Sequence, residues 1–366
     1  MNNSRRAVIN VILIQEISMF FTSKTFRSQK GAAQCIMGLG THQEFVDRPT
    51  ADSYISILAF CLQGRSLEEL KTYISNNHFP WEYIEWSTSH NFLIKTTNTY
   101  LSECEELYIK NQLFLDSLFN RTFDMKNTFG DYTIIIAGCG GIGNFMSYAI
   151  SSLSVRKIVL IDFDHIEESN LNRQFLFTSS DIGQLKTEIL AKALRERGCK
   201  AEIETYSSKT SYQTLSKILS NNEGKMFCIL SADSAGILQD TTKCFAEYEV
   251  PFINVGYFND IAAIGPLYDR DHACPLCGNA LSVEAKCSAT DTNNLYELIN
   301  RNYSAPSSFT NNALASAMAM SDIISYIVGD KEGVQSFNKR IGIDTRTLKR
   351  YELPVEKDWK CKYCGK

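Results

Sequence analysis

The chain has 366 residues, 44% of them hydrophobic and 21% charged, with a formal net charge of −4. These values are typical of a globular protein that is long enough for two or three domains. Because the chain has no long Lys- or Arg-rich run and no apolar stretch of membrane-spanning length, we expect neither a nucleic-acid partner nor a membrane span.

The N-terminal segment combines two arginines, Arg5 and Arg6, with an apolar stretch over residues 8–14. A secretory signal requires a longer unbroken apolar core and a small-residue cleavage site. Asn10 and Glu16 interrupt this one, and the alternation over residues 8–21 predicts a strand instead. We therefore expect a cytoplasmic protein.

The first part of the chain, residues 1–125, predicts a small α/β domain of its own. A helical pattern covers residues 50–62. Ser66 predicts the start of a second helix, because Glu69 three residues later completes a capping box. An aromatic run over residues 79–83 then leads into a polar stretch.

The second part, residues 126–366, alternates strands and helices. β-branched and apolar runs predict strands at residues 132–137, 157–161, 201–206, 226–231 and 251–255, with helical segments between them. This order predicts a doubly wound, mostly parallel sheet of Rossmann type. After Gly256 the pattern becomes irregular, until a long helix over residues 310–328 and a strand pair at 339–344 and 347–353.

A glycine loop joins the first predicted strand of this sheet to its helix. The loop contains Gly138, Gly140, Gly141 and Gly143. Glycines at such a turn bring backbone N–H groups and a helix N-terminus onto phosphate. Asp162 ends the next strand, where a carboxylate can bind a ribose hydroxyl. These features alone also fit an NAD-dependent oxidoreductase, or a tight turn that binds no ligand.

The following segments separate these alternatives. Residues 168–175 (ESNLNRQF) and 181–186 (DIGQLK), together with the glycine loop and the stretch 161–164 (IDFD), closely resemble the family of ThiF, MoeB and the ubiquitin-activating enzymes. The resemblance covers about residues 130–260 and implies an ATP-dependent adenylating enzyme. The resemblance gives Arg173 and Lys186 a role, whereas the oxidoreductase alternative leaves these two residues unexplained.

The resemblance also assigns site residues. It implies that Asp162 contacts the ribose, that Asp233 holds Mg²⁺, and that Arg173 and Lys186 act on the triphosphate. Fixed cations are expected there because attack on the α-phosphate develops negative charge on phosphoryl oxygens. The other implied nucleotide-binding residues are the four loop glycines, Asp164, Asn170 and Gln174.

Two C-x-x-C pairs, Cys274 with Cys277 and Cys361 with Cys364, can together complete a four-cysteine zinc site. Four protein ligands leave no open position, so the metal is expected to be structural. The alternatives are a redox pair and four unrelated thiols. Cys287 lies in the segment where ubiquitin-activating relatives carry a thioester cysteine, but no neighbouring base marks it as activated, and we expect a bystander thiol.

Three further stretches, residues 254–268, 338–343 and the short N-terminal domain, resemble a peptide-modifying branch of the family that includes MccB and PaaA. This resemblance implies a winged-helix-like peptide clamp over residues 1–125, which binds the leader of a ribosomally made precursor peptide as an added strand. The adenylation domain, residues 126–366, would then activate glutamate carboxylates for dehydration and cyclisation, as PaaA-like enzymes do in antibiotic biosynthesis.

Several alternatives stay open at this stage. An MccB-like enzyme would instead adenylate a C-terminal asparagine. Relatives also carry an arginine that reaches the partner's ATP in a homodimer, and here His90 or Arg121 stands in its place. If neither fills that role, phosphoryl rather than adenylyl transfer becomes an alternative. An inactive partner subunit is the alternative outside enzymes.

Overall fold

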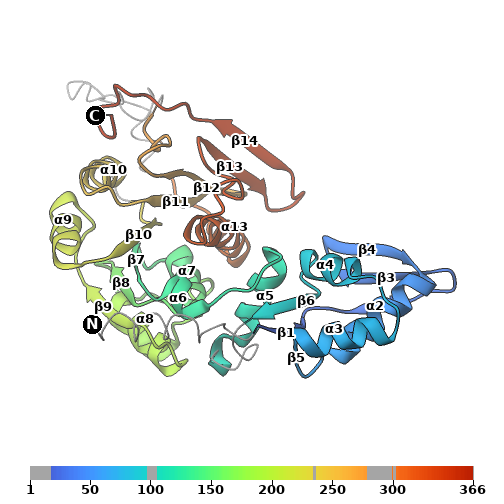
Figure 1. Ribbon diagram of the computed structural model, residues 1–366. Coiled ribbons are helices and arrows are strands. Elements are labelled where there is room, and N and C mark those ends of the chain that lie inside the picture. Colours follow the sequence, from blue (N-terminus) through green and yellow to red (C-terminus); the bar gives the residue numbers. More distant parts are fainter. Residues whose placement is uncertain (1–17, 97–104, 234–235, 278–298, 300–301, 366) are drawn as a thin grey trace, which may run out of the picture. The chain divides into compact units, whose positions relative to one another are not determined.

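The computed structural model describes residues 18–96, 105–233, 236–277, 299 and 302–365. The chain forms two units, an N-terminal unit (Met1–Met125) and a C-terminal unit (Lys126–Lys366). Figure 1 shows the elements of each, and each is described by itself. In the described part of the chain, no helix is both long and apolar enough to cross a membrane.

The C-terminal unit is built on an eight-stranded sheet of order β14-β13-β12-β11-β10-β7-β8-β9. Its parallel strands are β7 (Tyr132–Ala137), β8 (Lys157–Ile161), β9 (Glu202–Tyr206), β10 (Lys225–Leu230) and β11 (Phe252–Phe258). The antiparallel strands at one edge are β12 (Ile261–Tyr268), β13 (Lys339–Asp344) and β14 (Arg350–Pro354). The predicted doubly wound, mostly parallel sheet is therefore confirmed.

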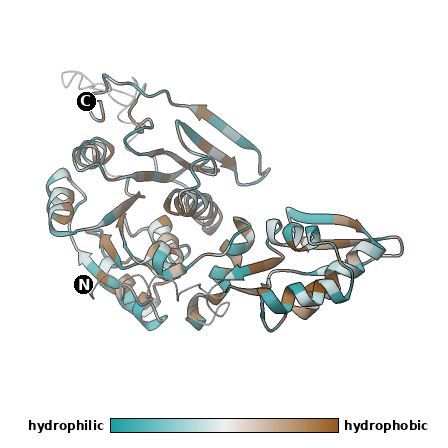
Figure 2. Ribbon diagram, in the orientation of Figure 1, coloured by the Kyte–Doolittle hydropathy of each residue, from teal (hydrophilic) through white to brown (hydrophobic). Residues whose placement is uncertain are grey.

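Helices cover both faces of this sheet (Figure 1). They are α7 (Gly141–Ser151), α8 (Lys186–Glu196), α9 (Tyr212–Asn221), α10 (Ile237–Glu247) and α13 (Phe309–Ile327). Helices α9 and α10 pack together on one face, whereas α7 packs against α8 and α13 on the other. The short α6 (Met125–Phe129) precedes β7. Because both faces are covered, the central strands are apolar along their length, as Figure 2 shows.

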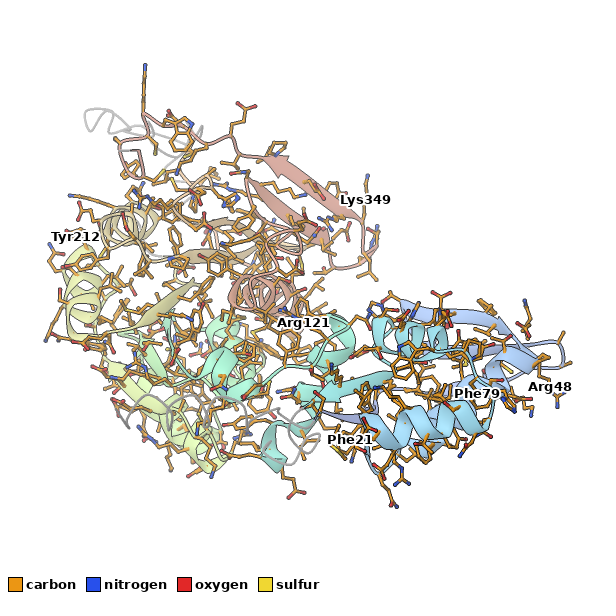
Figure 3. The ribbon with its side chains drawn as sticks, in the orientation of Figure 1. Phe21, Arg48, Phe79, Arg121, Tyr212 and Lys349 are labelled. Carbon is orange, nitrogen blue, oxygen red and sulfur yellow. The ribbon has the colours of Figure 1, made fainter. Side chains whose placement is uncertain are left out.

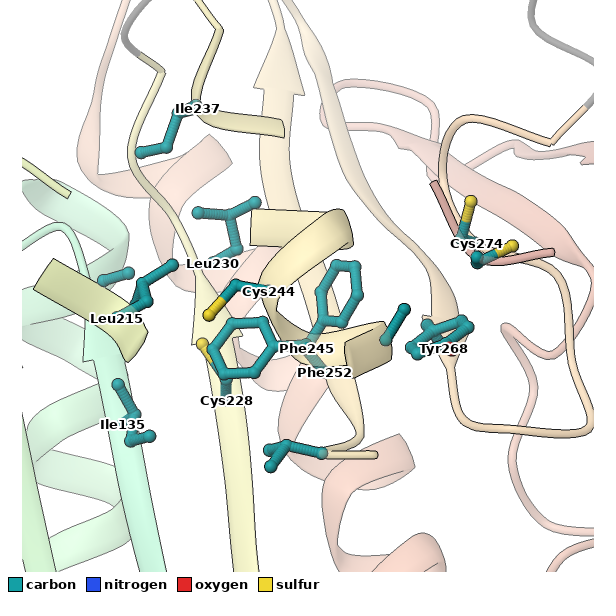
Figure 4. Close-up of a cluster of buried hydrophobic side chains, with 14 of the residues drawn as sticks. Ile135, Leu215, Cys228, Leu230, Ile237, Cys244, Phe245, Phe252, Tyr268 and Cys274 are labelled. Carbon is teal, nitrogen blue, oxygen red and sulfur yellow. The ribbon is translucent and has the colours of Figure 1, made fainter. Parts of the chain in front are cut away.

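The core on the α9–α10 face continues into the C-terminal tail. Phe245 and Phe252 are fully buried and their ring centroids lie 5.5 Å apart. The thiols of Cys228 and Cys244 point toward each other beside them (Figure 4). Tyr268 extends the same cluster toward the four predicted metal cysteines, which are also part of it. The tail is thus packed on the core of the sheet.

One strand of this sheet was not expected. The region after Gly256 reads as irregular, yet β12 is an eight-residue strand that pairs with both β11 and β13. Gly265 and Pro266 lie inside it. These two residue types are rare in strand interiors, and Pro266 lacks the N–H that a ladder requires, so propensity argues against a strand here. Pairing on both sides and burial override that local preference.

The N-terminal unit contains two three-stranded sheets and a set of helices. One sheet has the order β5-β1-β6, and the other is the meander β2-β3-β4. The strands are β1 (Met19–Thr22), β2 (Ser28–Lys30), β3 (Gln34–Leu39), β4 (His42–Asp47), β5 (Arg65–Ser66) and β6 (Leu93–Thr96). The helices are α2 (Arg48–Phe60), α3 (Leu67–Asn76), α4 (Glu82–Ser89) and α5 (Ile109–Leu118).

Both predicted helices of this unit are present. Ser66 caps α3, and the reciprocal bond from Glu69 completes the predicted capping box. The predicted N-terminal strand is present from Met19 onward, and its residues 8–17 lie outside the described part of the chain. The meander over residues 28–47 was not expected, because its polar, glycine-containing sequence carries only a weak alternating pattern.

Candidate functional site

The candidate site lies where the strand order of the sheet reverses. Strand β7 pairs with β8 on one side and with β10 on the other, so the chain leaves the carboxyl ends of β7 and β10 in opposite directions. Such a switch point is where open α/β sheets bind ligands. The two strand ends are joined by Ser231, whose N–H donates to Ala137 O at 2.9 Å and whose hydroxyl donates to Gly138 O at 2.9 Å.

Some positions of the loop after β7 require a glycine for steric reasons, and others do not. Gly138 has φ +100°, and a Cβ there would lie 2.7 Å from the backbone nitrogen of Ala232. A Cβ at Gly143 would overlap the carbonyl oxygen of Gly138. Gly140 has no such constraint, because a Cβ there would meet nothing within 4 Å. Gly140 is the N-cap of α7, so this open space lies at the helix N-terminus.

Asp162 follows β8 and is bound to the glycine loop. Its Oδ2 accepts from Cys139 N at 2.6 Å, and its Oδ1 accepts from Asp164 N at 2.8 Å. The carboxylate therefore links the turn after β8 to the turn after β7. Each oxygen keeps a second lone pair with which it can accept a hydrogen bond from a ligand hydroxyl.

Lys186 and Asp164 form an ion pair beside it. The lysine Nζ lies 2.8 Å from Asp164 Oδ2, and its side chain is 8% exposed compared with 47% for the aspartate. Lys186 also begins α8, and its N–H donates to Asp164 O at 3.0 Å. The structure thus holds this lysine close to Asp162 and the loop, in a position where a phosphate can replace the carboxylate as its partner.

Asn170, Arg173 and Gln174 share one tight turn. The side-chain Oδ1 of Asn170 accepts from Glu167 N at 3.1 Å, and its carbonyl accepts from the N–H groups of Arg173 and Gln174. Arg173 is half-buried, and its guanidinium donates to Ser169 O and Asn172 Oδ1, both at 2.8 Å. Gln174 is 2% exposed, so its side chain is buried beneath this turn.

Asp233 lies just beyond the carboxyl end of β10. It is exposed and follows Ser231 and Ala232, the two residues in contact with the loop glycine Gly138. An exposed carboxylate at a switch point is a suitable ligand for Mg²⁺, which prefers oxygen donors and retains several waters. The residues present therefore fit the metal that the family resemblance implies.

Two buried asparagines were missed by sequence reasoning. Asn144, in the first turn of α7, has an exposed fraction of 0%, and its Oδ1 accepts from Leu176 N at 3.0 Å. Asn312, in the first turn of α13, is 2% exposed, and its side-chain oxygen lies so close to Gly141 that a Cβ there would overlap it. A polar residue inside an apolar helical run was the available signal for Asn144.

The four predicted metal cysteines meet in one buried cluster, and their sulfur atoms all lie within 4.8 Å of one another. The distances are 3.7 Å for Cys274–Cys277, 3.8 Å for Cys274–Cys361 and 3.4 Å for Cys277–Cys364. Four sulfurs at about 2.3 Å from a tetrahedral zinc are separated by about 3.8 Å. The cluster therefore has the donor set and spacing of a structural zinc site. Cys287 lies outside the described residues.

The two candidates for the arginine role belong to the N-terminal unit. His90 ends α4, its Nδ1 lies 2.8 Å from Trp86 O, and its ring packs on Trp86 with centroids 4.3 Å apart. Arg121, which is labelled in Figure 3, is exposed, and its guanidinium lies 4.6 Å from the centroid of the Phe123 ring. Both residues therefore have contacts within the N-terminal unit, and Arg121 is the one that carries a permanent charge.

Comparison with known proteins identifies the family. The model of the ThiF family matches residues 119–363, which is most of the chain. The chain belongs to the ThiF family. The glycine loop, Asp162, the turn of Asn170, Lys186 and Asp233 all lie inside the matched region, so the family resemblance read from these motifs is confirmed.

Curated relatives each match a part of the chain. The NEDD8-activating enzyme E1 catalytic subunit of Arabidopsis thaliana is 32% identical over 108 residues, which is 29% of this chain and 24% of that protein. The molybdopterin-synthase adenylyltransferase of Haemophilus influenzae is 28% identical over 154 residues, which is 42% of this chain and 61% of that protein. The chain thus spans about a quarter of the Arabidopsis relative's length and about three fifths of the Haemophilus one.

Solved structures extend the likeness to nearly the whole chain. E. coli MccB with MccA-N7isoAsn has a TM-score of 0.79 at 24% identity, covering 95% of this chain and 100% of that one. PaaA has a TM-score of 0.66 at 15% identity, covering 92% and 100%. At these identities the two comparisons establish a shared fold.

Proposed function

We propose that this protein uses Mg·ATP to activate a carboxyl group of a ribosomally made peptide by adenylation. The observation that carries the proposal is the switch point, where the open N-terminus of α7 at Gly140, the Lys186–Asp164 pair and the exposed Asp233 lie on connected turns. Membership of a family that includes a molybdopterin-synthase adenylyltransferase supports adenylyl transfer.

In this reaction a substrate carboxylate oxygen attacks the α-phosphorus of ATP, and the bond from that phosphorus to the bridging oxygen breaks to release pyrophosphate. Asp233 would hold Mg²⁺, which would neutralise phosphate charge. The N–H groups at the start of α7 receive the phosphates, Lys186 exchanges Asp164 for a phosphate oxygen, and Arg173 supplies a second cation. Asp162 orients the ribose. Asn170 and Gln174 hold the turn that carries Arg173.

The second part of the proposal concerns the step after activation. A backbone nitrogen of the peptide attacks the activated glutamate carbonyl, AMP leaves, and the peptide has lost one water for each ring closed, as in PaaA-like chemistry. An MccB-like adenylation of a C-terminal asparagine is the second candidate. It is favoured by the higher TM-score with MccB, 0.79 compared with 0.66 for PaaA, and MccB has been crystallised with ATP and with MccA.

We also propose that the N-terminal unit binds the leader of the precursor peptide as a strand added to β4. Among the described strands β4 pairs with β3 alone and lies at the edge of its sheet, and Gln43, Glu44 and Phe45 are exposed on it. Phe45 is 63% exposed, which offers an apolar contact beside the free backbone edge. Phe45→Ala should weaken binding of a fluorescent leader peptide, whereas Leu62→Ala, at a residue 67% exposed elsewhere on the unit, should not.

Two structural roles complete the proposal. The four-cysteine cluster would hold a zinc ion that fastens the C-terminal tail to the segment after β12. A homodimer would bring Arg121, whose guanidinium carries a permanent charge, to the partner's ATP. Light scattering measures the mass of the particle, and Arg121→Ala should reduce turnover without changing that mass.

The test of the main proposal tracks peptide mass and nucleotide products together. The protein is incubated with ATP, Mg²⁺ and short peptides encoded beside its gene. AMP, pyrophosphate and a peptide lighter by one or more waters support adenylation followed by cyclisation. A nucleotide mass added to the peptide supports the MccB-like reaction, and ADP indicates phosphoryl activation.

The Asp233→Asn variant decides the role of the metal ligand. It should abolish turnover, while Glu196→Gln, at an exposed acid at the far end of α8, should leave turnover unchanged. Equal ATP consumption by Asp233→Asn and the unaltered protein would contradict the Mg²⁺ assignment. No ATP turnover with any peptide would place the inactive-partner alternative first.

A further inference from the structure

Asn144 is a buried polar residue at a central place in the site. It follows Gly143 directly and lies in the first turn of α7, where its N–H donates to Gly140 O at 2.9 Å. Its exposed fraction is 0%. A bound nucleotide therefore does not touch this side chain, and any effect of Asn144 on the reaction passes through the groups that it holds.

The side chain of Asn144 joins two separate parts of the site. Its Oδ1 accepts from Leu176 N at 3.0 Å. Leu176 comes three residues after Arg173, in the turn whose backbone is fixed by bonds to Asn170 O. One amide group thus connects the first turn of the phosphate-facing helix to the turn that carries a cation of the site.

In the described part of the chain, the side-chain amide of Asn144 is satisfied at its oxygen and unsatisfied at its nitrogen. The Nδ2 of Asn144 has no hydrogen-bond partner among the described residues, and the Oε1 of Gln174 in the neighbouring turn has none either. An unpaired buried amide group destabilises the fold by about 1–3 kcal/mol. Leucine has the higher helix propensity, but it would leave the buried N–H of Leu176 without its acceptor. The bond to Leu176 is therefore what an asparagine supplies at this position.

Ser147, three residues after Asn144 on α7, is a buried polar residue whose hydrogen bond stays within the helix. It is also 0% exposed and lies one turn further along α7. Its hydroxyl donates to Asn144 O at 3.0 Å, a bond that stays inside the helix. Ser147 therefore has the burial of Asn144 but no link to the Arg173 turn.

We propose that Asn144 is a positioning residue, whose amide keeps the Arg173 turn in register with the N-terminus of α7. The guanidinium and the helix N–H groups then face the same triphosphate. The inference rests on the proposed function, because it assumes that this end of the sheet binds ATP. It adds that the placement of Arg173 depends on a group that contacts no nucleotide.

The experiment measures Mg·ATP affinity by isothermal titration calorimetry, which requires no peptide. The variants are Asn144→Leu, Arg173→Ala, the double variant and the control Ser147→Ala. Asn144→Leu should weaken Mg·ATP binding about tenfold, the order expected for misplacing one charge-assisted contact, while Ser147→Ala stays near the unaltered protein. The double variant should bind no more weakly than Arg173→Ala alone, because residues that act through one another are not additive.

Two results of this experiment would overturn the proposal. Additive losses in the double variant, or full affinity in Asn144→Leu, would overturn the proposal. If Asn144→Leu does not fold, Asn144→Ala replaces it in the same cycle, since the smaller side chain cannot overfill the helix contact. Failure of the unaltered protein to bind Mg·ATP would instead refute the proposed function, so the two failures are distinguishable.

Discussion

The replacement of Gly140 by alanine tests whether the glycine loop is a phosphate site or only a tight turn. In the free protein the change is small. A Cβ at this position meets nothing within 4 Å, and the residue has φ −70°. Loss of a glycine N-cap destabilises a helix by roughly 0.5–1 kcal/mol, while the stiffer unfolded chain returns about 0.4–1 kcal/mol. We therefore expect the unfolding temperature of Gly140→Ala to change by less than about 3 °C.

With ATP the same methyl group becomes an obstacle. The open space at Gly140 lies at the N-terminus of α7, where a phosphate would approach the backbone N–H groups. A methyl group there prevents at least one charge-assisted hydrogen bond, which is worth about 1.5–3 kcal/mol. Mg·ATP should therefore bind about 10- to 150-fold more weakly to Gly140→Ala.

The matched variant is Gly143→Ala, which should behave in the opposite way. A Cβ at Gly143 overlaps the carbonyl oxygen of Gly138, so the turn must shift even without ligand. We expect a loss of about 1–3 kcal/mol in the free energy of unfolding, as in other overpacked sites. Calorimetry and thermal unfolding are measured on both variants. Unchanged ATP affinity in Gly140→Ala would refute the phosphate role of the loop.

Three further predictions concern the parts around the site. Ser66→Ala removes the capping box of α3 and should reduce stability by about 1 kcal/mol in thermal or urea unfolding, whereas the exposed Thr72→Ala stays within about 0.5 kcal/mol. Phe252→Ala empties a fully buried position in the core and should destabilise the protein by about 3–5 kcal/mol, measured the same way. Cys364→Ser removes one sulfur of the buried cluster, and elemental analysis should show the loss of bound zinc together with a lower unfolding temperature, by roughly 5 °C or more. A metal-free preparation of the unaltered protein with full stability would contradict the last of these.

The elements of the parallel sheet could be predicted because their signals are local. A continuous apolar run such as residues 132–137 predicts a buried strand when glycines and a helical pattern follow it. Strand β7 ends at Ala137, as this pattern predicts. The Ser66 capping box is similarly complete within four residues. The cysteine cluster could be predicted as well, because two C-x-x-C spacings indicate four ligands for one ion whatever the fold.

The features that were missed depend on contacts between distant segments. Strand β12 is stabilised by pairing with β11 and with β13, which lies more than seventy residues later in the chain. In the meander β2-β3-β4, Cys35 and Met37 of β3 are buried in the core of the N-terminal unit, so burial against distant segments stabilises it together with its own ladder. The ion pair of Lys186 with Asp164 and the bond from Leu176 to Asn144 also required the folded chain. Spacing along the sequence indicates which residues belong to a site, but not which of them restrain one another.

The hydrogen bonds and contacts within the candidate site differ on the two sides of the switch point. Asp162, Asp164 and Lys186 are linked to the turn after β7 through backbone bonds and one ion pair, so this side of the switch point is largely ordered before ATP arrives. Such preorganisation favours binding of a constant ligand, since little conformational entropy remains to be lost. On the other side, Asn312 brings the start of α13 against Gly141. The first turn of α13 is therefore in direct contact with α7, where the rings of Phe145 and Phe309 also pack together. Under the proposed function, this contact would transmit a shift of α13 to the N-terminus of α7, which would receive the phosphates.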